Sequence, residues 1–165
     1  FGTDPSGDRP GFVRADATNY RFSDILAAVG VAQLERADDI TSRRREIAAV
    51  YDDLLESVEG VDTPTVIENG EHNYQCYCVY LEAGDDSLRD TLIDDLAAEE
   101  IETQIGTYAL SETEAFGDAR QGSDLTTAKD LYHNLLTLPV SHSMTDGDQH
   151  RVVDTLQRVI NDHIE

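Results

Sequence analysis

NYRFSDILAAVGVAQLERADDITSRRREIAAVYDDLL (residues 19–55) begins with three polar side chains and continues with apolar residues at helical spacing. Ser23 is a plausible N-cap, because its hydroxyl can accept from a free N–H group of the first turn. The spacing predicts either one helix of about 35 residues or two helices with a bend near Asp38 and Asp39. The apolar positions are Ile25, Ala28, Val29, Ala32, Ile40, Ile47, Val50, Tyr51 and Leu54.

The same segment has a slim face and a recognisable end. Ala27, Ala28 and Gly30 would let another backbone approach closely. Such a surface suits a contact between subunits or domains, although tight packing inside one domain suits it equally well. We expect Gly60 to end the helical region and Pro64 to prevent the helix from continuing beyond it.

The polar triplet Asn19, Tyr20 and Arg21 stands just before the N-terminus of the predicted helix. Free backbone N–H groups and the helix dipole favour an anion there, and Asn and Arg add directed donors. The triplet is therefore a candidate phosphate corner. By itself the pattern leaves an alternative open, in which Arg21 pairs with one of the many carboxylates of the chain.

Short strands alternate with helices in the rest of the chain. Residues 74–81, YQCYCVYL, are apolar or aromatic on both faces, which indicates an inner strand covered on both sides. Overall the pattern predicts an α/β fold, a small sheet with helices against it. The other predicted elements are helices over 88–100 and 126–134, strands at 101–105 and 135–140, and a last helix with the stripe Val152, Val153, Leu156, Val159 and Ile160.

Two predicted helices carry the sequence pattern of a capping box, a hydroxyl residue followed three positions later by an acid. Ser87 and Asp90 form this pattern before the helix at 88–100, and Thr145 and Asp148 form it before the last helix. We expect both boxes to close.

The charge balance is strongly acidic: 34 acidic residues against 12 basic ones give a net charge of −22. This excludes nucleic acid as a partner, because binding requires Lys and Arg to displace counterions from phosphates. A solvated surface is the plain explanation. A sharper explanation is a halophilic protein, because the repulsion between its own negative charges is screened near molar salt. No apolar run approaches the roughly 18 residues of a membrane span and no leader is recognisable, so we expect a cytoplasmic protein.

The sequence offers little for a metal or a disulfide. Cys76 and Cys78 lie two positions apart on one face of the predicted strand, where disulfide geometry would distort the backbone. A metal would need two more suitable ligands, so we expect two small buried thiols. The five histidines show no shared metal spacing, and the acidic segments 83–87 and 145–150 lack the EF-hand pattern.

Three further residues are candidates for ligand contact. His72 stands at the entrance of strand 74–81, where an imidazole can contact a substrate or exchange a proton near neutral pH. A histidine hydrogen-bonded at a strand edge is the alternative. Tyr108 and Ser111 lie in a loop that follows a strand and can line a cleft, although Tyr108 suits a core-filling role equally well.

Residues 19–55 closely resemble the long-helix segment of the DegT/DnrJ/StrS family of sugar aminotransferases, which use pyridoxal 5′-phosphate (PLP). EHNYQCYCVYL (71–81), IETQIGTYAL (101–110) and LLTLPVSHSMTDGDQHRVVDTL (135–156) resemble later family segments, in the expected order. The resemblance covers about residues 14–163. It implies the C-terminal portion of a fold-type I enzyme: a long helix followed by a small, mainly antiparallel sheet with helices packed on it.

The resemblance also implies how this portion would work in the whole enzyme. The family forms homodimers whose active sites lie between subunits, so we expect a homodimer through the long helix region. The Asn of the triplet reaches the PLP phosphate of the other subunit in such enzymes. That role falls on Asn19, with Tyr20 and Arg21 beside it as cofactor-binding residues.

On the substrate side, the resemblance places His72 and Tyr108 near a nucleotide-linked keto-sugar, to which glutamate normally donates its amino group. Ser111 is the third residue carried over to this side. Here the sequence departs from the family, because related sequences commonly have His at this position and Pro where this chain has Glu114.

The resemblance implies a Schiff-base lysine upstream of every matched segment. Lys129, the only lysine of the chain, stands in a predicted helix outside any matching context, and we expect it to be solvated. The predicted parts are a loop with the phosphate corner (1–22), the long interdomain helix region (23–59) and the small C-terminal domain (60–165). The catalytic large domain is absent, so we expect no catalytic residue and no activity from this chain alone.

Phe1 begins a turn-like stretch, from which we expect that something precedes it in the gene. The leading hypothesis is the C-terminal part of a haloarchaeal-type PLP-dependent sugar aminotransferase of amino-sugar biosynthesis. The alternative is a catalytically inactive stand-alone relic or dimerisation module of the same fold. A third hypothesis, an acidic metal buffer, would require tight calcium binding in molar salt.

Overall fold

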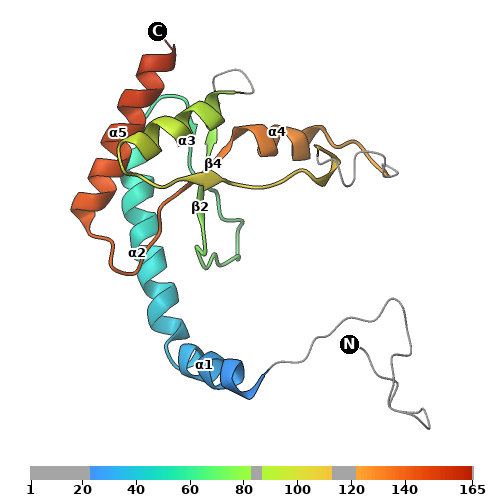
Figure 1. Cartoon of the computed structure of the whole chain (residues 1–165), viewed down its shortest axis with the longest axis vertical. Helices are drawn as coiled ribbons and strands as arrows, with labels where there is room; N and C mark the ends of the chain where they lie inside the picture. Colours follow the sequence, from blue (N-terminus) through green and yellow to red (C-terminus); the bar gives the residue numbers. More distant parts are fainter. Residues whose placement is uncertain (1–22, 83–86, 113–121, 165) are drawn as a thin grey trace. The chain divides into compact units, whose positions relative to one another are not determined.

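The computed structural model describes residues 23–82, 87–112 and 122–164. The chain divides into two units, Phe1–Asp38 and Asp39–Glu165. Figure 1 shows helices and short strands throughout the described part, which confirms the predicted α/β class. None of the helices in the described ranges combines the length and the apolar character that crossing a bilayer requires.

The long helical region consists of two helices, α1 (Asp24–Leu34) and α2 (Ala37–Leu55), so the two-helix alternative is the correct one. Ser23 caps α1 as predicted, with its Oγ accepting from the N–H of Leu26 at 3.3 Å. The end of α2 was predicted too late: the helix stops at Leu55, and Gly60, at φ 80°, lies in the following turn.

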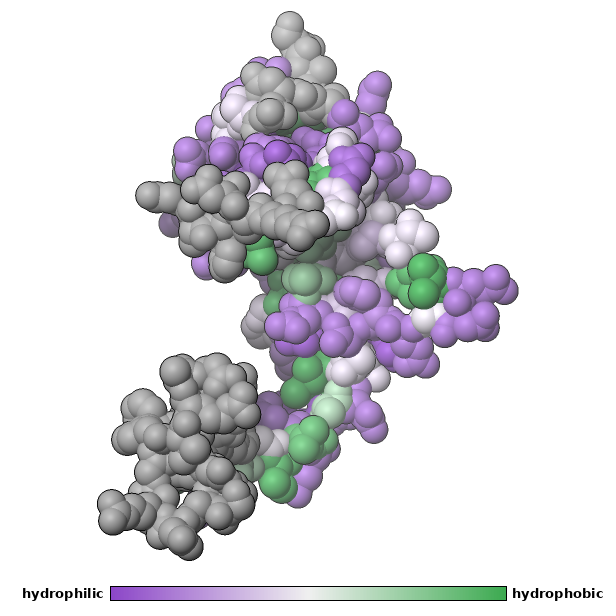
Figure 2. All heavy atoms as spheres, turned by 90° about the vertical axis from the view of Figure 1, so that its right-hand side faces the viewer, coloured by the Kyte–Doolittle hydropathy of each residue, from purple (hydrophilic) through white to green (hydrophobic). Residues whose placement is uncertain are grey.

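Helix α1 is apolar on all sides and has no buried residue. Ile25 and Leu34 are 80% and 75% exposed, and Leu26, Val29 and Val31 are also exposed. Figure 2 shows hydrophobic atoms along this helix, in contrast to the hydrophilic surface over much of the remaining view. A helix that is apolar all round normally becomes buried in a larger structure.

Four short strands form one sheet in the order β1-β2-β4-β3, and every pair is antiparallel. The strands are β1 (Val61–Asp62), β2 (Tyr77–Leu81), β3 (Gln104–Ile105) and β4 (Leu135–Leu138). This confirms the small antiparallel sheet and the inner position of β2. The prediction missed β1, and β2, β3 and β4 are shorter than expected.

One face of the sheet carries the core. Tyr77, Val79 and Leu81 of β2 are buried, whereas the alternate residues Cys78 and Tyr80 are only half-buried, so the prediction of a strand covered on both sides was wrong. Helices α2, α3 (Leu88–Ala98) and α5 (Asp146–Ile164) supply most of the rest of the core, and buried residues of β1, β4 and the connecting segments complete it. All five residues of the predicted α5 stripe are buried.

The second face of the sheet is less covered. Helix α4 (Thr126–Asn134), found where it was predicted, contacts β2 through Tyr80, whose hydroxyl donates to Asp130 at 3.1 Å. Cys76, just before β2, is exposed and Cys78 is half-buried. The prediction of two buried thiols was therefore wrong, because the strand alternation places both on the face away from the core.

The two expected capping boxes differ. At α5 the box forms: Thr145 N and Oγ1 donate to Asp148 Oδ2 at 2.8 and 2.7 Å, and Asp148 N donates to Thr145 Oγ1 at 3.2 Å. At α3 it does not, because Ser87 makes no side-chain capping bond and Asp90 instead pairs with Arg89 Nε at 2.6 Å.

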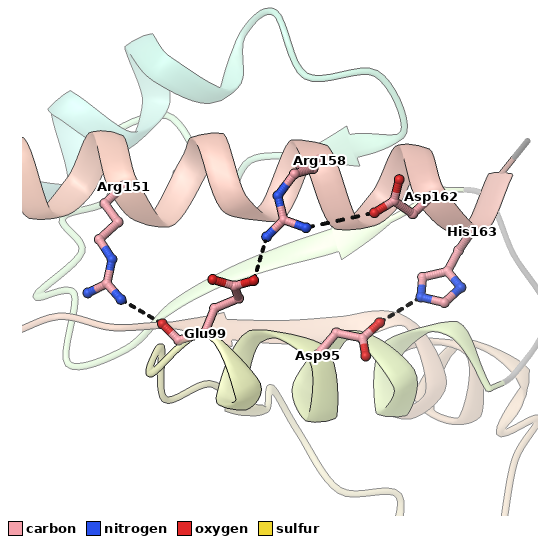
Figure 3. A network of polar contacts seen from close by, with 6 residues as sticks. All are labelled: Asp95, Glu99, Arg151, Arg158, Asp162 and His163. Atoms are coloured by element: carbon pink, nitrogen blue, oxygen red, sulfur yellow. Dashed lines mark hydrogen bonds and ion pairs between the residues drawn. The ribbon is translucent and has the colours of Figure 1, made fainter.

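Arginines join the elements of the second unit. Figure 3 shows the joint between α3 and α5, where Arg158 reaches Glu99 and Asp162, and His163 Nε2 lies 2.7 Å from Asp95 Oδ2. Four arginines of the described part donate to a main-chain carbonyl of another segment: Arg43 to Met144, Arg45 to His72, Arg89 to Tyr132 and Arg151 to Glu99.

Candidate functional site

The cofactor-binding triplet Asn19, Tyr20 and Arg21 lies outside the described residues. The phosphate corner therefore stays a prediction. The described part nevertheless places each of the three substrate-side candidates, His72, Tyr108 and Ser111.

His72 lies in the irregular segment 71–76 before β2, called the His72 turn below, rather than at the strand edge itself. The N–H of Tyr74 donates to His72 Nδ1 at 3.0 Å, and the N–H of Gln75 donates to Asn73 Oδ1 at 3.1 Å. Tyr74 has φ 44°, a left-handed conformation that residues with a side chain rarely adopt. Arg45 of α2 also contacts this turn, a contact that no local sequence signal indicated.

Stacked aromatic rings connect this turn to the core. The rings of Tyr74 and Tyr77 stack with centroids 6.2 Å apart, and those of Tyr77 and Tyr51 lie 5.0 Å apart. The hydroxyl of Tyr77 donates to Asp52 Oδ1 at 2.6 Å. Burial, followed by this hydrogen bond, raises the pKa of the Tyr77 phenol far above its ordinary value, so the phenol stays neutral. The His72 turn thus packs, through Tyr74, on a core tyrosine that does not ionise.

Tyr108 is exposed rather than buried in the core. Its side chain is 67% exposed and borders a pocket of about 370 Å³ between α3 and β3. Its ring centroid lies 6.1 Å from that of Tyr132 on α4. The core-filling alternative for Tyr108 is therefore wrong, and its contact with a ligand stays a prediction. The pocket is lined by Asp90, Ile93, Asp94, Gln104, Ile105 and Tyr108.

Ser111 lies in the short 3-10 turn Leu110–Glu112 and is half-buried. Next to it, Glu112 Oε1 accepts from Lys129 Nζ at 2.7 Å. The hydrogen bond from Lys129 lowers the pKa of Glu112. The only lysine of the chain is thus paired rather than simply solvated, and it ties this turn to α4.

The structure does not bring His72 and Tyr108 together. Strands β2 and β3 both run antiparallel to β4 and are therefore parallel to each other. His72 precedes β2 and Tyr108 follows β3, so the two residues flank opposite ends of the sheet. The start of β2 pairs with Leu138 of β4, and the residue after β3 bonds to Leu135 at the other end of β4. These two residues of β4 alone are roughly 10 Å apart along the strand at the usual rise per residue.

A second pocket, of about 390 Å³, lies near the end of the sheet where β2 begins. Cys76 belongs to its wall, and burial raises the pKa of the neighbouring Cys78 thiol. Across the described ranges, His, Cys, Asp and Glu side chains form no group of three or more that could hold a metal ion. The other wall residues are Gln75, Glu102, Thr103, Gln104, Thr137, Leu138, Pro139, Val140 and Ser141.

Comparison with known proteins identifies the family. Residues 2–157 match the model of the DegT/DnrJ/EryC1/StrS aminotransferase family. GDP-perosamine synthase of Caulobacter vibrioides is 32% identical over 143 residues, which cover 86% of this chain and 38% of that protein. The putative pyridoxal phosphate-dependent aminotransferase EpsN of Bacillus subtilis is 32% identical over 141 residues, which cover 84% of this chain and 36% of that protein.

Solved structures agree. The aminotransferase TlmJ from Streptoalloteichus hindustanus matches with a TM-score of 0.73 at 27% identity, over 84% of this chain and 36% of that one. The chain thus spans well under half the length of the relatives it matches. Because the family match extends over nearly all of its residues, this chain belongs to the DegT/DnrJ/EryC1/StrS aminotransferase family.

Proposed function

We propose that this chain is the C-terminal part of a PLP-dependent aminotransferase that acts on nucleotide-linked keto-sugars in amino-sugar biosynthesis, with glutamate as amino donor. The observation that carries the proposal is a family match over residues 2–157 in a chain that spans only 38% of GDP-perosamine synthase. The matched strings resemble the late part of the family in their sequence order.

When bound, PLP supplies the electron sink for amino transfer, and it is attached through a lysine amine. Lys129 is the only lysine of this chain, and its Nζ, on α4, is paired with Glu112. We therefore expect no covalent attachment of the cofactor through this chain. The proposed contribution of this chain is non-covalent: Asn19, with Tyr20 and Arg21, holds the cofactor phosphate of the other subunit.

His72, Tyr108 and Ser111 are the proposed substrate-side residues. The exposed Tyr108 ring and the exposed His72 turn both support this assignment, because each is accessible to a ligand. They lie beyond opposite ends of the sheet, so we do not expect a single sugar ring to contact both within one chain. An elongated nucleotide-sugar, or two active sites of a dimer, would be needed.

The test is borohydride trapping of PLP, read by mass spectrometry. We expect no adduct on the 165-residue chain, and one adduct at an upstream lysine on the product of the longer reading frame. A Lys129→Arg variant of the 165-residue chain is the control for incidental labelling of its only amine-bearing side chain. Transamination by the 165-residue chain alone, or a start codon and promoter directly before Phe1, would refute the proposal.

A second candidate, a stand-alone dimerisation module without catalytic function, is favoured by α1. That helix has exposed apolar residues on all sides and no buried residue. The departure at Ser111 and Glu114 also fits a loss of substrate contact. The two candidates are distinguished by the upstream reading frame, because only the aminotransferase requires one.

A further inference from the structure

We propose that His72 presents its Nε2–H as a fixed hydrogen-bond donor to an oxygen atom of the ligand, and that Arg45 of α2 is the residue that positions it. The proposal rests on the proposed function in one respect, the assignment of His72 to the substrate side. The fixed ring and the role of Arg45 stand on the geometry of this chain and can be tested without any ligand.

The hydrogen bond at Nδ1 determines the tautomer of His72. A backbone N–H group can only donate, so the bond from Tyr74 N at 3.0 Å requires an unprotonated, accepting Nδ1. The neutral imidazole then carries its proton on Nε2. In the described part of the chain no group accepts from Nε2, and the residue is exposed. His72 is therefore a donor whose natural partner is a ligand oxygen, such as that of a carbonyl or phosphoryl group.

The backbone of the turn favours one orientation of the ring. Tyr74 holds a left-handed φ of 44°, which its neighbours must stabilise. Its ring makes a T-shaped contact with the His72 ring at a centroid distance of 4.5 Å and also stacks on the ring of Tyr77. The imidazole is thus fixed both through Nδ1 and through its contact with a ring that rests on the core.

Arg45 holds the same turn from a helix 27 residues away in sequence. Its Nε donates to the carbonyl oxygen of His72 at 3.1 Å, and its Nη2 donates to Glu71 Oε2 at 2.8 Å. The planar guanidinium can make both bonds at once, which an ammonium group cannot do with the same geometry. Pairing with Glu71 also offsets a negative charge next to His72, which matters for an anionic ligand in a chain of net charge −22.

The ring state can be measured on the 165-residue chain by long-range ¹H–¹⁵N NMR of the histidine side chains in molar NaCl. His72→Gln removes one set of signals and so assigns them. We expect the wild-type chain to show the Nε2–H tautomer at His72. Arg45→Ala should convert these signals to a mixture of tautomers, and Arg45→Lys should give an intermediate result because only one of the two bonds can be kept.

Arg44→Ala is the matched control, because it removes the same charge from the neighbouring position of α2 and no contact of Arg44 with the turn is seen. Near-ultraviolet circular dichroism of the Tyr51–Tyr77 pair verifies that each variant is folded. Should Arg45→Ala fail this check, Arg45→Lys carries the comparison. An Nδ1–H tautomer in the wild type, or His72 signals equally unchanged in the Arg45 and Arg44 variants, would overturn the proposal.

Activity of the longer protein tests the ligand contact separately. His72→Ala should lower kcat/KM for the nucleotide-sugar about tenfold, the usual effect of losing one hydrogen bond to a charged or polar partner. His72→Gln should restore part of the loss, because its amide also donates. If the enzyme transaminates but His72→Ala has no effect, the ligand contact is refuted. If it does not transaminate at all, while the tautomer is fixed as expected, the proposed function fails instead.

Discussion

Cys76 and Cys78 stand two residues apart, yet their thiols have different environments. Cys76 is exposed at the wall of a pocket. Cys78 is half-buried, and its Sγ lies 3.4 Å from Thr137 Oγ1. The composition of the strand suggested two buried thiols, but burial depends on which face the helices cover, and this cannot be read from a strand that is apolar on both faces.

We predict that iodoacetamide alkylates Cys76 several times faster than Cys78 near pH 8. The thiolate is the nucleophile, and burial raises the pKa of Cys78, so a smaller fraction of it is ionised at that pH. Peptide mapping at short reaction times gives the ratio of the two rates. Cys76→Ser and Cys78→Ser variants report each thiol alone, and equal rates would contradict the environments described above.

Gly106 occupies a position with no room for a side chain. A Cβ atom there would lie 2.5 Å from the Cβ of Leu135, and the N–H of Gly106 donates to the carbonyl of Leu135 at 3.0 Å. This close approach of β3 to β4 fixes the start of the loop that carries Tyr108.

We predict that Gly106→Ala lowers the free energy of unfolding by about 1–3 kcal/mol, the usual cost of forcing extra volume into a packed site. Urea unfolding followed by circular dichroism measures the change. Gly122→Ala is the matched control, because a Cβ at Gly122 would meet nothing within 4 Å. Equal stability of the two variants would show that β3 can shift to make room.

At the scale of elements, the sequence pattern predicted the helices best. The apolar stripe of α5 and the bounds of α4 were predicted correctly, because each follows from a periodicity within the element itself. β1 was missed because two residues carry no period, and its existence depends on pairing with β2. The break between α1 and α2 at Glu35 and Arg36 was misplaced by a few residues for a related reason, since no Gly or Pro marks it.

The candidate site follows the same division. His72 and Tyr108 could be selected from the sequence because they stand at the ends of predicted strands. Their separation could not, because it depends on strand order. The contact between Arg45 and His72 could not be predicted either, because it joins a helix to a loop that only the fold brings together.

The capping box of α5 gives a prediction on pH dependence. Hydrogen bonds from the side chain and then the backbone of Thr145 lower the pKa of Asp148 below its ordinary value of 3.8. A carboxylate whose pKa is lower in the folded state stabilises the fold above that ordinary value, and the contribution is lost as the pH falls through the lowered one. Asp148→Asn should therefore lower the thermal midpoint at neutral pH and weaken its fall between about pH 5 and pH 2.

Thermal unfolding at a series of pH values provides the measurement. Asp146→Asn removes the same charge from the same helical turn, and its carboxylate makes none of the capping bonds. A much smaller effect of Asp146→Asn supports the capping bonds as the cause. An equal effect would assign the stabilisation to the helix dipole instead.

At the scale of the whole molecule, the exposed apolar surface of α1 is the feature that the described part of the chain does not account for. Successive residues of an α-helix are rotated by about 100°, so Ile25, Leu26, Val29, Val31 and Leu34 point in all directions. All five are exposed. A contact on one face would cover only some of them, which favours burial between several surfaces.

We predict that the 165-residue chain self-associates through α1 in molar salt, where repulsion between the acidic surfaces is screened. Val29→Asp should shift the mass measured by light scattering towards that of the monomer. Gln33→Asp adds the same charge to α1 without removing apolar surface and serves as the control. A monomeric wild-type chain at about 100 µM, or equal behaviour of the two variants, would contradict a role for α1 in assembly.

The arginine joints have a consequence for how this molecule responds to its medium. A peptide oxygen cannot be neutralised by acid or replaced by a point mutation, so the anchors of Arg43, Arg45, Arg89 and Arg151 persist while the carboxylates around them titrate or drift in evolution. Arg43, Arg45 and Arg89 each also pair with one carboxylate, but 34 acidic residues stand against 12 basic ones. Most carboxylates of the surface must therefore attract sodium or potassium ions from the solution. Dialysis into pure water should consequently expand the acidic surface first, and the four arginine-to-carbonyl hydrogen bonds should be the last to break.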